Sequence, residues 1–271
     1  MTTAVVVTYR SREWIRGCLE SLGNLPKIVV DNASDDGTAD LVATGFPEAR
    51  LIRRRTNGGF AVAVNDAIRS VPGEDVLLVN PDVVVDLPGI AKLSAYLAAH
   101  PSVGIVAPVL RYPDGRQQES VRSFPNPLAM LARRSPFGRT RLGRRLLAGY
   151  IVSSDAIDAP RPVDWAIGAA MLVRGTAIQA VGGMPEWIFL YGEDLEWCIR
   201  MWQCGWQVHV DPRVTFVHQY VRLSRRTLDL RSAPVRHHWA SLLKIYGRHP
   251  GLLLGRGPSE ARRVIKAAGF G

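Results

Sequence analysis

The sequence predicts an α/β fold with a mostly parallel, Rossmann-like central sheet flanked by helices and a smaller part beyond it. Through the first 110 residues, short runs rich in Val and Ile alternate with stretches of helical periodicity. The runs are apolar at nearly every position, which is typical of parallel strands buried on both faces. The chain has 271 residues, 47% of them hydrophobic. This is enough for one domain with a sizeable core.

The first half of the chain divides into alternating strands and helices. The strands are indicated by β-branched residues and the helices by apolar residues three or four positions apart, as in Trp14, Cys18 and Leu22. The expected strands are Ala4–Thr8, Lys27–Val30, Arg50–Arg53, Val76–Val79 and Val103–Ala107. The expected helices are Glu13–Leu22, Thr38–Gly45, Phe60–Ser70 and Gly89–Ala99.

The second half is less regular. Residues 111–160 are rich in Arg, Pro and Gly, which predicts long loops and one short helix. Val163–Arg174 is expected to form a buried strand or turn, and Leu195–Cys204 an amphipathic helix. Val208–His218 is expected to form two short strands broken at Asp211-Pro212.

Positive charge is concentrated in two segments. The net charge is +10. Residues 111–150 hold nine Arg and two acidic residues, and residues 213–271 hold twelve Lys or Arg and two acidic residues. Such segments favour phosphate-bearing partners, either an anionic membrane surface or a diphosphate; a solvated basic face is the alternative. No nucleic acid is expected as a partner, because neither segment interleaves its basic residues with aromatic ones.

The chain start and the apolar runs bear on localisation. Only Ala4–Val7 precede the polar Thr8, and no run approaches the roughly 18–20 apolar residues that span a bilayer. We therefore expect a cytoplasmic protein whose membrane contact is peripheral, on the inner face of the plasma membrane. Cys18, Cys198 and Cys204 are odd in number and widely spaced, so free thiols are expected.

Polar residues gather where the predicted strands end. Thr8-Tyr9, Asp31-Asn32, Asn57-Gly58-Gly59 and Asn80-Pro81-Asp82 lie at or just beyond four strand ends. Ligands of open α/β sheets bind at the carboxyl ends of the strands. We therefore expect the four clusters to line one cleft.

Two of these carboxylates suit a nucleotide ligand. Asp31 can accept the N3–H of a uracil or thymine ring, and an Asx-turn cap explains it equally well. Asp82, held at a strand tip, can share Mg²⁺ or Mn²⁺ with a diphosphate, although Asn-Pro-Asp also forms a plain turn. The residues alone leave these alternatives open.

Two further positions suit acid–base or metal chemistry. Glu193 and Asp194 are adjacent at the start of an apolar-faced helix, where one carboxyl pKa can rise into the range of a general base. A helix cap is the alternative. His218 ends an apolar run and can either complete a metal site or be structural.

Together, the motifs resemble those of a known family. In order they are VVVTYRSREWIRGCLESL, IVVDNASDDGT, NGGFAVAVN, VLLVNPDVVV, VDWAIGAAMLVR, FLYGEDLEWCIRMWQCGW and FVH. They are similar to the motif series of the family 2 inverting glycosyltransferases. The closest resemblance is to the rhamnosyltransferase-like branch, in which NPD replaces the more usual DxD.

The resemblance implies a GT-A fold and a role for each matching residue. Asn80 stands where a first carboxylate is usual, and a glycine expected three positions after His218 is missing. The implied donor-binding residues are Thr8, Tyr9, Asp31, Asn57, Gly58, Phe60, Asn80 and Asp82. The implied ligands of Mg²⁺ or Mn²⁺ are Asp82 and His218. The residues implied to line the acceptor side are Trp165 and Gly168. The implied catalytic base is Asp194, with Glu193 as its partner.

The resemblance also implies a domain organisation. Residues 1–220 would form the GT-A domain, with residues 1–110 as its nucleotide-sugar-binding half and residues 111–220 as its acceptor half. Residues 221–271 would be a basic C-terminal helical extension packed on the same domain.

The implied function is the transfer of one sugar, with inversion, from a dTDP- or UDP-sugar to a lipid-linked or polysaccharide acceptor of cell-wall or envelope synthesis. The resemblance to the rhamnosyltransferase-like branch implies that the sugar is L-rhamnose and the donor dTDP-L-rhamnose. One alternative is a degenerate, non-catalytic nucleotide-sugar-binding protein, which Asn80 favours. Another is a sugar-nucleotide nucleotidyltransferase, which would need a glycine-rich loop after the first strand. Release of free nucleoside diphosphate on mixing donor and acceptor distinguishes the transferase from the binding protein.

Overall fold

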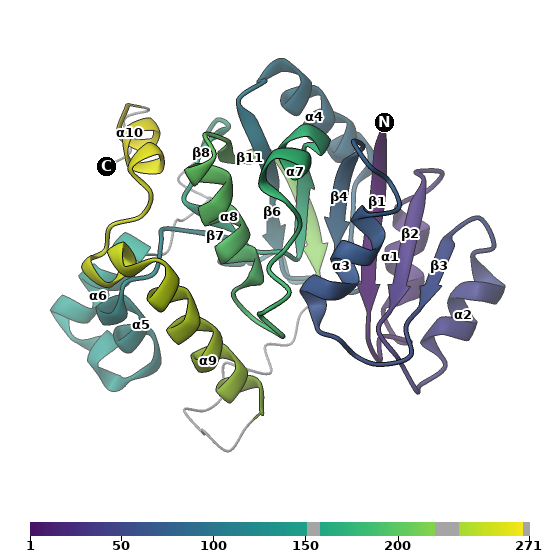
Figure 1. Ribbon diagram of the computed structural model, residues 1–271, viewed down its shortest axis with the longest axis horizontal. Helices are drawn as coiled ribbons and strands as arrows, with labels where there is room; N and C mark the ends of the chain where they lie inside the picture. The colour runs from purple at the N-terminus through teal and green to yellow at the C-terminus, as the bar shows by residue number, and fades with distance from the viewer. Residues whose placement is uncertain (151–157, 220–232, 268–271) are drawn as a thin grey trace.

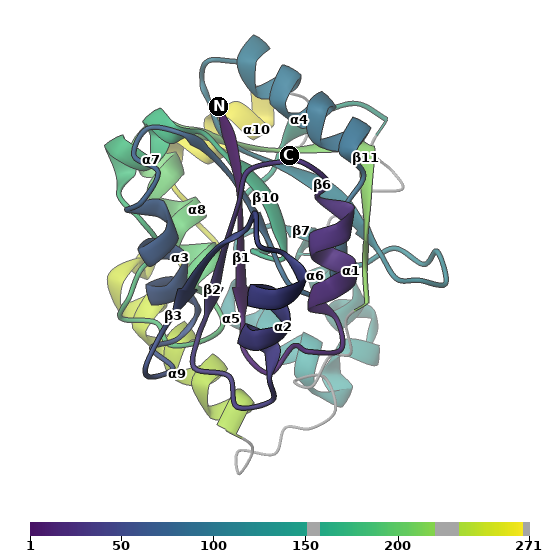
Figure 2. The same cartoon turned by 90° about the vertical axis from the view of Figure 1, so that its right-hand side faces the viewer.

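The computed structural model describes residues 1–150, 158–219 and 233–267. Its centre is a nine-stranded sheet of order β3-β2-β1-β4-β10-β6-β11-β5, with β8 paired to β11 off this path. Helices cover both faces of the sheet (Figures 1 and 2). The predicted α/β fold class, with a mostly parallel sheet, is therefore confirmed.

The first four strands of the chain run parallel to one another, with the order β3-β2-β1-β4 in the sheet. They are β1 (Thr2–Thr8), β2 (Lys27–Asp31), β3 (Arg50–Arg53) and β4 (Asp75–Val79). The chain proceeds from β1 to β2 and β3 on one side and then returns to place β4 on the other side of β1. This reversal of strand order between β1 and β4 is where open α/β sheets bind their ligands.

The second half of the sheet contains one reversed strand. β10 (Ala170–Val173) lies antiparallel between β4 and β6 (Val103–Arg111), and β11 (Gln207–His218) runs parallel to β6. The short strands β5 (Val83–Val84) and β8 (Arg161–Pro162) pair antiparallel with β11.

The core has two layers, one on each face of the sheet, because successive side chains of a strand point to opposite faces. In β1, Val5 and Val7 face one layer while Ala4 and Val6 face the other, as the period of two requires. The first layer is covered by α3 (Phe60–Ile68), α7 (Gly175–Val181) and α8 (Glu193–Gln203); the second is covered by α1 (Ile15–Ser21), α2 (Thr38–Gly45) and α4 (Leu87–Ala99).

The expectation of loops and one short helix in residues 111–160 was wrong. The described part forms β7 (Val121–Arg122), α5 (Pro127–Arg134), the 3₁₀ turn η1 (Pro136–Arg139) and α6 (Arg141–Tyr150), and β7 pairs with β9 (Trp165–Ala166). The sequence contains a signal for the start of helix α5. Asn126 caps α5 by accepting a hydrogen bond from Ala129 N at 2.8 Å, and Pro127 occupies the first turn.

The prediction of two short strands in Val208–His218 was also wrong, because β11 is one strand, although an irregularity is present at the predicted position Asp211-Pro212. Its register against β6 shifts between Asp211 and Thr215, so proline lies where the ladder is already interrupted. Asp211 stabilises the irregularity by accepting hydrogen bonds from the backbone and the side chain of Arg213.

The C-terminal part is helical. It consists of α9 (Ala233–Arg248), the 3₁₀ turn η4 (Pro250–Leu254) and α10 (Ser259–Ala267), and Leu242, Ile245, Leu252 and Ala261 are buried in the first core layer. None of the described helices is both long and apolar enough to cross a membrane. Cys18, Cys198 and Cys204 are free thiols.

Candidate active site

The carboxyl ends of β1 and β2 carry two buried polar side chains side by side. Thr8 pairs with Asp31 in the parallel register, and Asp31 Oδ2 accepts a hydrogen bond from Ser34 N at 3.0 Å. Asp31 Oδ1 and Thr8 Oγ1 are buried without a hydrogen-bond partner among the described residues. Because buried polar atoms are nearly always hydrogen-bonded, both oxygens are suited to a bound ligand. The neighbouring Tyr9 side chain is exposed.

Asn32 connects this edge to the segment before α3. Its Nδ2 donates to Asn57 Oδ1 at 2.9 Å and to Gly59 O at 3.1 Å, while its Oδ1 accepts from Gly58 N at 3.2 Å. The amide is buried, so it fixes the position of Asn57–Gly59 relative to the end of β2. The sequence placed Asn32 in one of the four polar clusters expected to line the cleft but gave it no role of its own.

The same segment also contacts the residues that lead into α8. Gly59 has φ +90°, and a Cβ there would lie 2.5 Å from Phe189 O, so only glycine fits this close approach. The next residue, Phe60, donates its N–H to Phe189 O at 3.3 Å. The tertiary structure thus brings Asn57–Phe60 against the segment that precedes Glu193.

Asp82 lies opposite His218 because β5 pairs with β11. Val83 is the register partner of His218, which places His218 Nε2 3.3 Å from Asp82 Oδ1. The Gln219 N–H also donates to Asp82 O at 2.9 Å. The two residues expected to hold a cation are therefore neighbours. The position of the missing glycine, three residues after His218, lies outside the described residues.

Gln118 determines which nitrogen of His218 faces Asp82. Its Nε2 donates to His218 O at 2.8 Å, so its Oε1 is the atom 2.7 Å from His218 Nδ1 and accepts a hydrogen bond there. In neutral His218, the proton is then on Nδ1 and the lone pair of Nε2 is directed at Asp82. A lone pair facing a carboxylate is suited to a cation between them. We did not identify Gln118 from the sequence, since it lies 100 residues from His218.

This pair can hold a hard divalent cation only with further oxygen ligands. Mg²⁺ prefers about six ligands, and within the described residues no three Asp, Glu, His or Cys side chains gather at one point. Phosphate oxygens of a nucleotide are the natural remaining ligands. The side chains therefore fit a cation that is shared with a diphosphate.

The acidic pair begins α8. Gly192 precedes it with φ +100°, and the Asp194 oxygens accept hydrogen bonds from Gly168 N at 2.9 Å and Leu195 N at 2.8 Å. Glu193 Oε2 is buried with no hydrogen-bond partner among the described residues. Burial raises the pKa of Glu193, and the charge of Asp194 raises it further. Burial also raises the pKa of Asp194.

The dipeptide Gly168-Ala169 joins the acidic pair to the end of β4. Gly168 N donates to Asp194, and Ala169 O accepts from Asn80 N at 2.8 Å. A Cβ on Gly168 would lie 3.5 Å from both Asp194 Cβ and Phe60 Cε1. Consequently the end of β4 at Asn80, the start of α3 at Phe60 and the acidic pair meet at this dipeptide.

Trp165 occupies a different kind of position. Its side chain is buried, its Nε1 donates to Ser123 O at 2.9 Å, and the Arg122 guanidinium lies 5.0 Å from its ring centre. These contacts hold the β7–β9 pair together, whereas Gly168 contacts Asp194 directly.

Helix α9 supports the segment that leads into α8. Ser241 Oγ donates to Leu190 O at 3.1 Å, and a Cβ on Gly192 would lie 2.9 Å from Ile245 Cδ1. The Arg248 guanidinium lies 4.1 Å from the Trp187 ring centre. The C-terminal extension is thus in direct contact with the segment carrying the acidic pair, which its sequence did not indicate.

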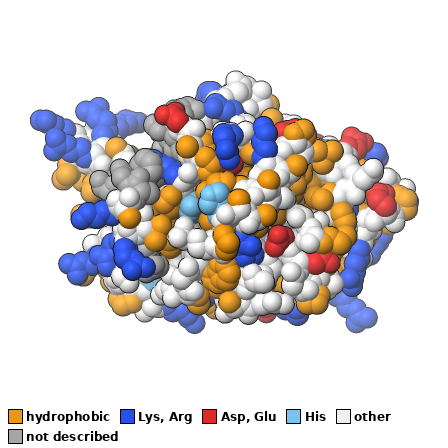
Figure 3. Space-filling view, turned by 90° about the horizontal axis from the view of Figure 1, so that it is seen from above, with side chains coloured by type: hydrophobic (Ala, Val, Ile, Leu, Met, Phe, Trp, Pro, Cys, Tyr) orange, Lys and Arg blue, Asp and Glu red, His pale blue; other side chains and the backbone are white. Residues whose placement is uncertain are grey.

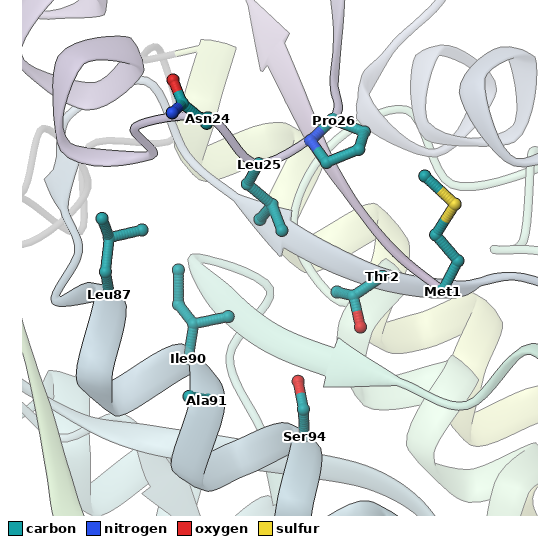
Figure 4. A pocket seen from close by; sticks show the side chains of 9 residues that line it. All are labelled: Met1, Thr2, Asn24, Leu25, Pro26, Leu87, Ile90, Ala91 and Ser94. Carbon is teal, nitrogen blue, oxygen red and sulfur yellow. The ribbon is translucent and has the colours of Figure 1, made fainter.

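A cavity of about 510 Å³ lies elsewhere in the molecule. It is lined by Met1 and Thr2 at the start of β1, by residues 24–26 before β2 and by the first turns of α4, as Figure 4 shows. These are the amino ends of the strands. The cavity is therefore separate from the polar residues at their carboxyl ends.

The site lies where α/β sheets bind nucleotides, and its acidic pair, with Glu193 buried and Asp194 partly buried, suits acid–base chemistry. Residues 3–155 match the family model described as Glycosyl transferase family 2, and residues 99–248 match the model described as Glycosyltransferase (GlcNAc). The protein is a glycosyltransferase. More particularly, the chain belongs to glycosyl transferase family 2, whose model covers more than half of its length.

Two relatives with curated names are named as rhamnosyltransferases. An N-acetylglucosaminyl-diphospho-decaprenol L-rhamnosyltransferase of Mycobacterium tuberculosis is 29% identical over 91% of this chain and 84% of its own. The rhamnosyltransferase WbbL of Escherichia coli is 22% identical over 80% and 83%. The fold is similar to that of the mannosyltransferase PcManGT of Pyrobaculum calidifontis, solved with GDP-Man and Mn²⁺, with a TM-score of 0.56, 19% identity, and coverage of 99% of this chain and 74% of that one.

Proposed function

We propose that the protein transfers L-rhamnose from dTDP-L-rhamnose, with inversion, to a hydroxyl group of a lipid-linked saccharide used in cell-wall synthesis. The names of the M. tuberculosis and E. coli relatives support the sugar, and the first also supports a diphosphate-linked polyprenol acceptor. The observation that carries the proposal is the meeting of the Asn80 motif, the donor segment and Asp194 at Gly168-Ala169.

The donor base would be held at the ends of β1 and β2. Asp31 Oδ1 is a buried acceptor without a partner among the described residues, which suits the N3–H of thymine or uracil. Asn32 holds Asn57 and Gly58 next to this edge, so both donor motifs can contact one nucleotide.

Asp82 and His218 would hold Mg²⁺ or Mn²⁺ together with the donor diphosphate. Gln118 keeps the Nε2 lone pair of His218 directed at this point. The chemistry that a divalent cation supplies there is neutralisation of charge on the leaving nucleoside diphosphate. The Mn²⁺ in the PcManGT structure supports this assignment.

Asp194 would be the general base. It takes the proton of the acceptor hydroxyl, whose oxygen bonds to the anomeric carbon while the bond to the diphosphate oxygen breaks on the opposite face. The N–H groups of Gly168 and Leu195 fix the orientation of the carboxylate. Burial raises its pKa, which makes it a stronger base than an exposed aspartate.

Substituting Asp194 tests this assignment. In Asp194→Asn, which cannot accept the proton, we expect transfer to fall by roughly 10²- to 10⁴-fold with donor binding nearly unchanged. Transfer is measured as release of nucleoside diphosphate with a polyprenyl-diphosphate N-acetylglucosamine acceptor, and binding as the thermal shift given by dTDP-L-rhamnose with Mn²⁺.

Asp75→Asn is the matched control. Asp75 Oδ1 also accepts a backbone N–H, from Gly175 at 2.8 Å, but at the amino end of β4. This variant should retain transfer. Turnover of Asp194→Asn within a few-fold of wild type would refute the base, and wild-type turnover with another nucleotide sugar but not with dTDP-L-rhamnose would refute the donor.

A further inference from the structure

One end of the molecule exposes several leucines on neighbouring elements. Leu128 and Leu131 lie one turn apart on α5, Leu142 on α6, and Leu253 and Leu254 on η4, each at least 50% exposed. With Leu243, residues 123–150 and 233–267 hold six of the eleven exposed large hydrophobic side chains among the described residues. Single exposed leucines are ordinary, whereas a group of them marks a binding surface.

The elements that carry these leucines are in contact. A Cβ on Gly138 of η1, the turn that joins α5 to α6, would lie 3.3 Å from Leu147 Cδ1 of α6. A Cβ on Gly255, which follows η4, would lie 3.8 Å from Asn126 Cβ at the start of α5. Tyr246 of α9 donates its hydroxyl to Pro125 O at 3.4 Å. Figure 1 shows α5 and α6 together at one end of the molecule, beyond the sheet.

The same end is strongly basic. Residues 121–150 contain seven Arg and neither Asp nor Glu. Arg139, Arg141, Arg144 and Arg145 are exposed, as is Arg256 after η4. Figure 3 shows Lys and Arg side chains gathered at this end. We call these five arginines and the five leucines of α5, α6 and η4 the Arg–Leu face.

We propose that the Arg–Leu face docks on the surface of an anionic lipid bilayer. Such a surface offers phosphate charge directly above an apolar layer, which matches arginines and leucines on short amphipathic helices. A nucleic acid or a soluble anionic glycan would neutralise the arginines but leave the leucines in water. Docking does not require that the acceptor be lipid-linked, so it can fail or hold independently of the proposed reaction.

Vesicle co-sedimentation of the full chain tests the proposal. Wild type is mixed at low salt with vesicles of phosphatidylglycerol and phosphatidylcholine, or of phosphatidylcholine alone, and should bind only the anionic ones. The triple variant R141Q/R144Q/R145Q should bind them roughly a hundredfold more weakly, since each basic residue near an anionic surface strengthens binding about five-fold.

The control variant R16Q/R50Q/K92Q removes the same charge from exposed positions on α1, β3 and α4. It should bind like wild type, and an equal loss would overturn the proposal because net charge alone would then explain binding. A second variant, L128S/L253S/L254S, should lose binding that persists at high salt. Absence of a preference for anionic vesicles, or equally tight binding to single-stranded RNA of matched charge, would also overturn it. Thermal unfolding establishes that each variant is folded.

Discussion

Gln118 is the residue whose importance was least visible in the sequence. It is buried, donates to the carbonyl of His218 and accepts from its Nδ1. Partners of this kind set the orientation of a metal-binding imidazole and strengthen its affinity for the metal. The acidic motifs could be matched from the sequence, but this contact depends on how β11 lies against the chain after β6.

Replacing Gln118 should weaken cation binding without removing a ligand. In Gln118→Leu we expect Mn²⁺ to bind roughly 10- to 100-fold more weakly, as measured by electron paramagnetic resonance in the presence of dTDP. Nitrogen NMR of the neutral imidazole in the metal-free protein should show that the proton of His218 is no longer held only on Nδ1. Gln117→Leu, the same change one residue earlier, should leave both properties unchanged. Unaltered Mn²⁺ affinity in Gln118→Leu would exclude the orienting role.

Glu193 should make the stability of the protein depend on pH. Burial and the charge of Asp194 raise its folded-state pKa above the ordinary value of 4.5. A carboxyl with a raised folded-state pKa contributes stability that is present below its unfolded pKa and is lost as pH rises through the folded pKa. As the pH is raised from about 5 to about 9, we therefore expect the melting temperature of the wild-type protein to fall by more than the melting temperature of Glu193→Gln.

Calorimetry over this pH range measures the difference. Glu48→Gln is the control, because Glu48 is exposed and the pKa of its carboxyl is lowered by hydrogen bonds from its own backbone and from Lys27. A parallel fall of the wild-type and Glu193→Gln melting temperatures would show that Glu193 ionises without cost in the folded protein.

At the scale of elements, the strands and helices of the first 110 residues were predicted well. Their signal is local, because apolar residues recur with a period of two or 3.6 along one segment. Two predictions were wrong in residues 111–218, where the short helix α5 and the bulged strand β11 obtain their stability from tertiary contacts. Propensity carries little information about such elements.

Helix α9 provides a prediction at this scale. Ile245 is fully buried and packs against Gly192, so Ile245→Ala should reduce the free energy of unfolding by about 2–5 kcal/mol. Because Gly192 precedes the acidic pair, kcat should fall while KM for the donor changes little, at temperatures where the variant is folded.

Leu243→Ala is the matched variant on the same helix. Leu243 is 69% exposed, so stability should change by no more than about 0.5 kcal/mol and kcat should stay at the wild-type value. If Ile245→Ala loses stability but retains kcat, α9 stabilises the fold without positioning the acidic pair.

At the scale of the whole molecule, one edge of the sheet combines parts from the entire described chain. Thr8 and Asp31 come from the first strands, Asp82 and Asp194 from segments 112 positions apart, and support for Gly192 comes from α9. The roles assigned to these residues stay predictions until the substitutions above are measured.

The sequence by itself determined the fold class, the family and the polar motifs at the strand ends, because these depend on residue types and spacings within short segments. Only the tertiary structure decided that Asn32 holds Asn57, that Gln118 orients His218 and that α9 supports the segment before the acidic pair. The physical reason is that each of these contacts joins residues far apart in the chain. Their meeting depends on strand register and helix packing, which no local pattern encodes.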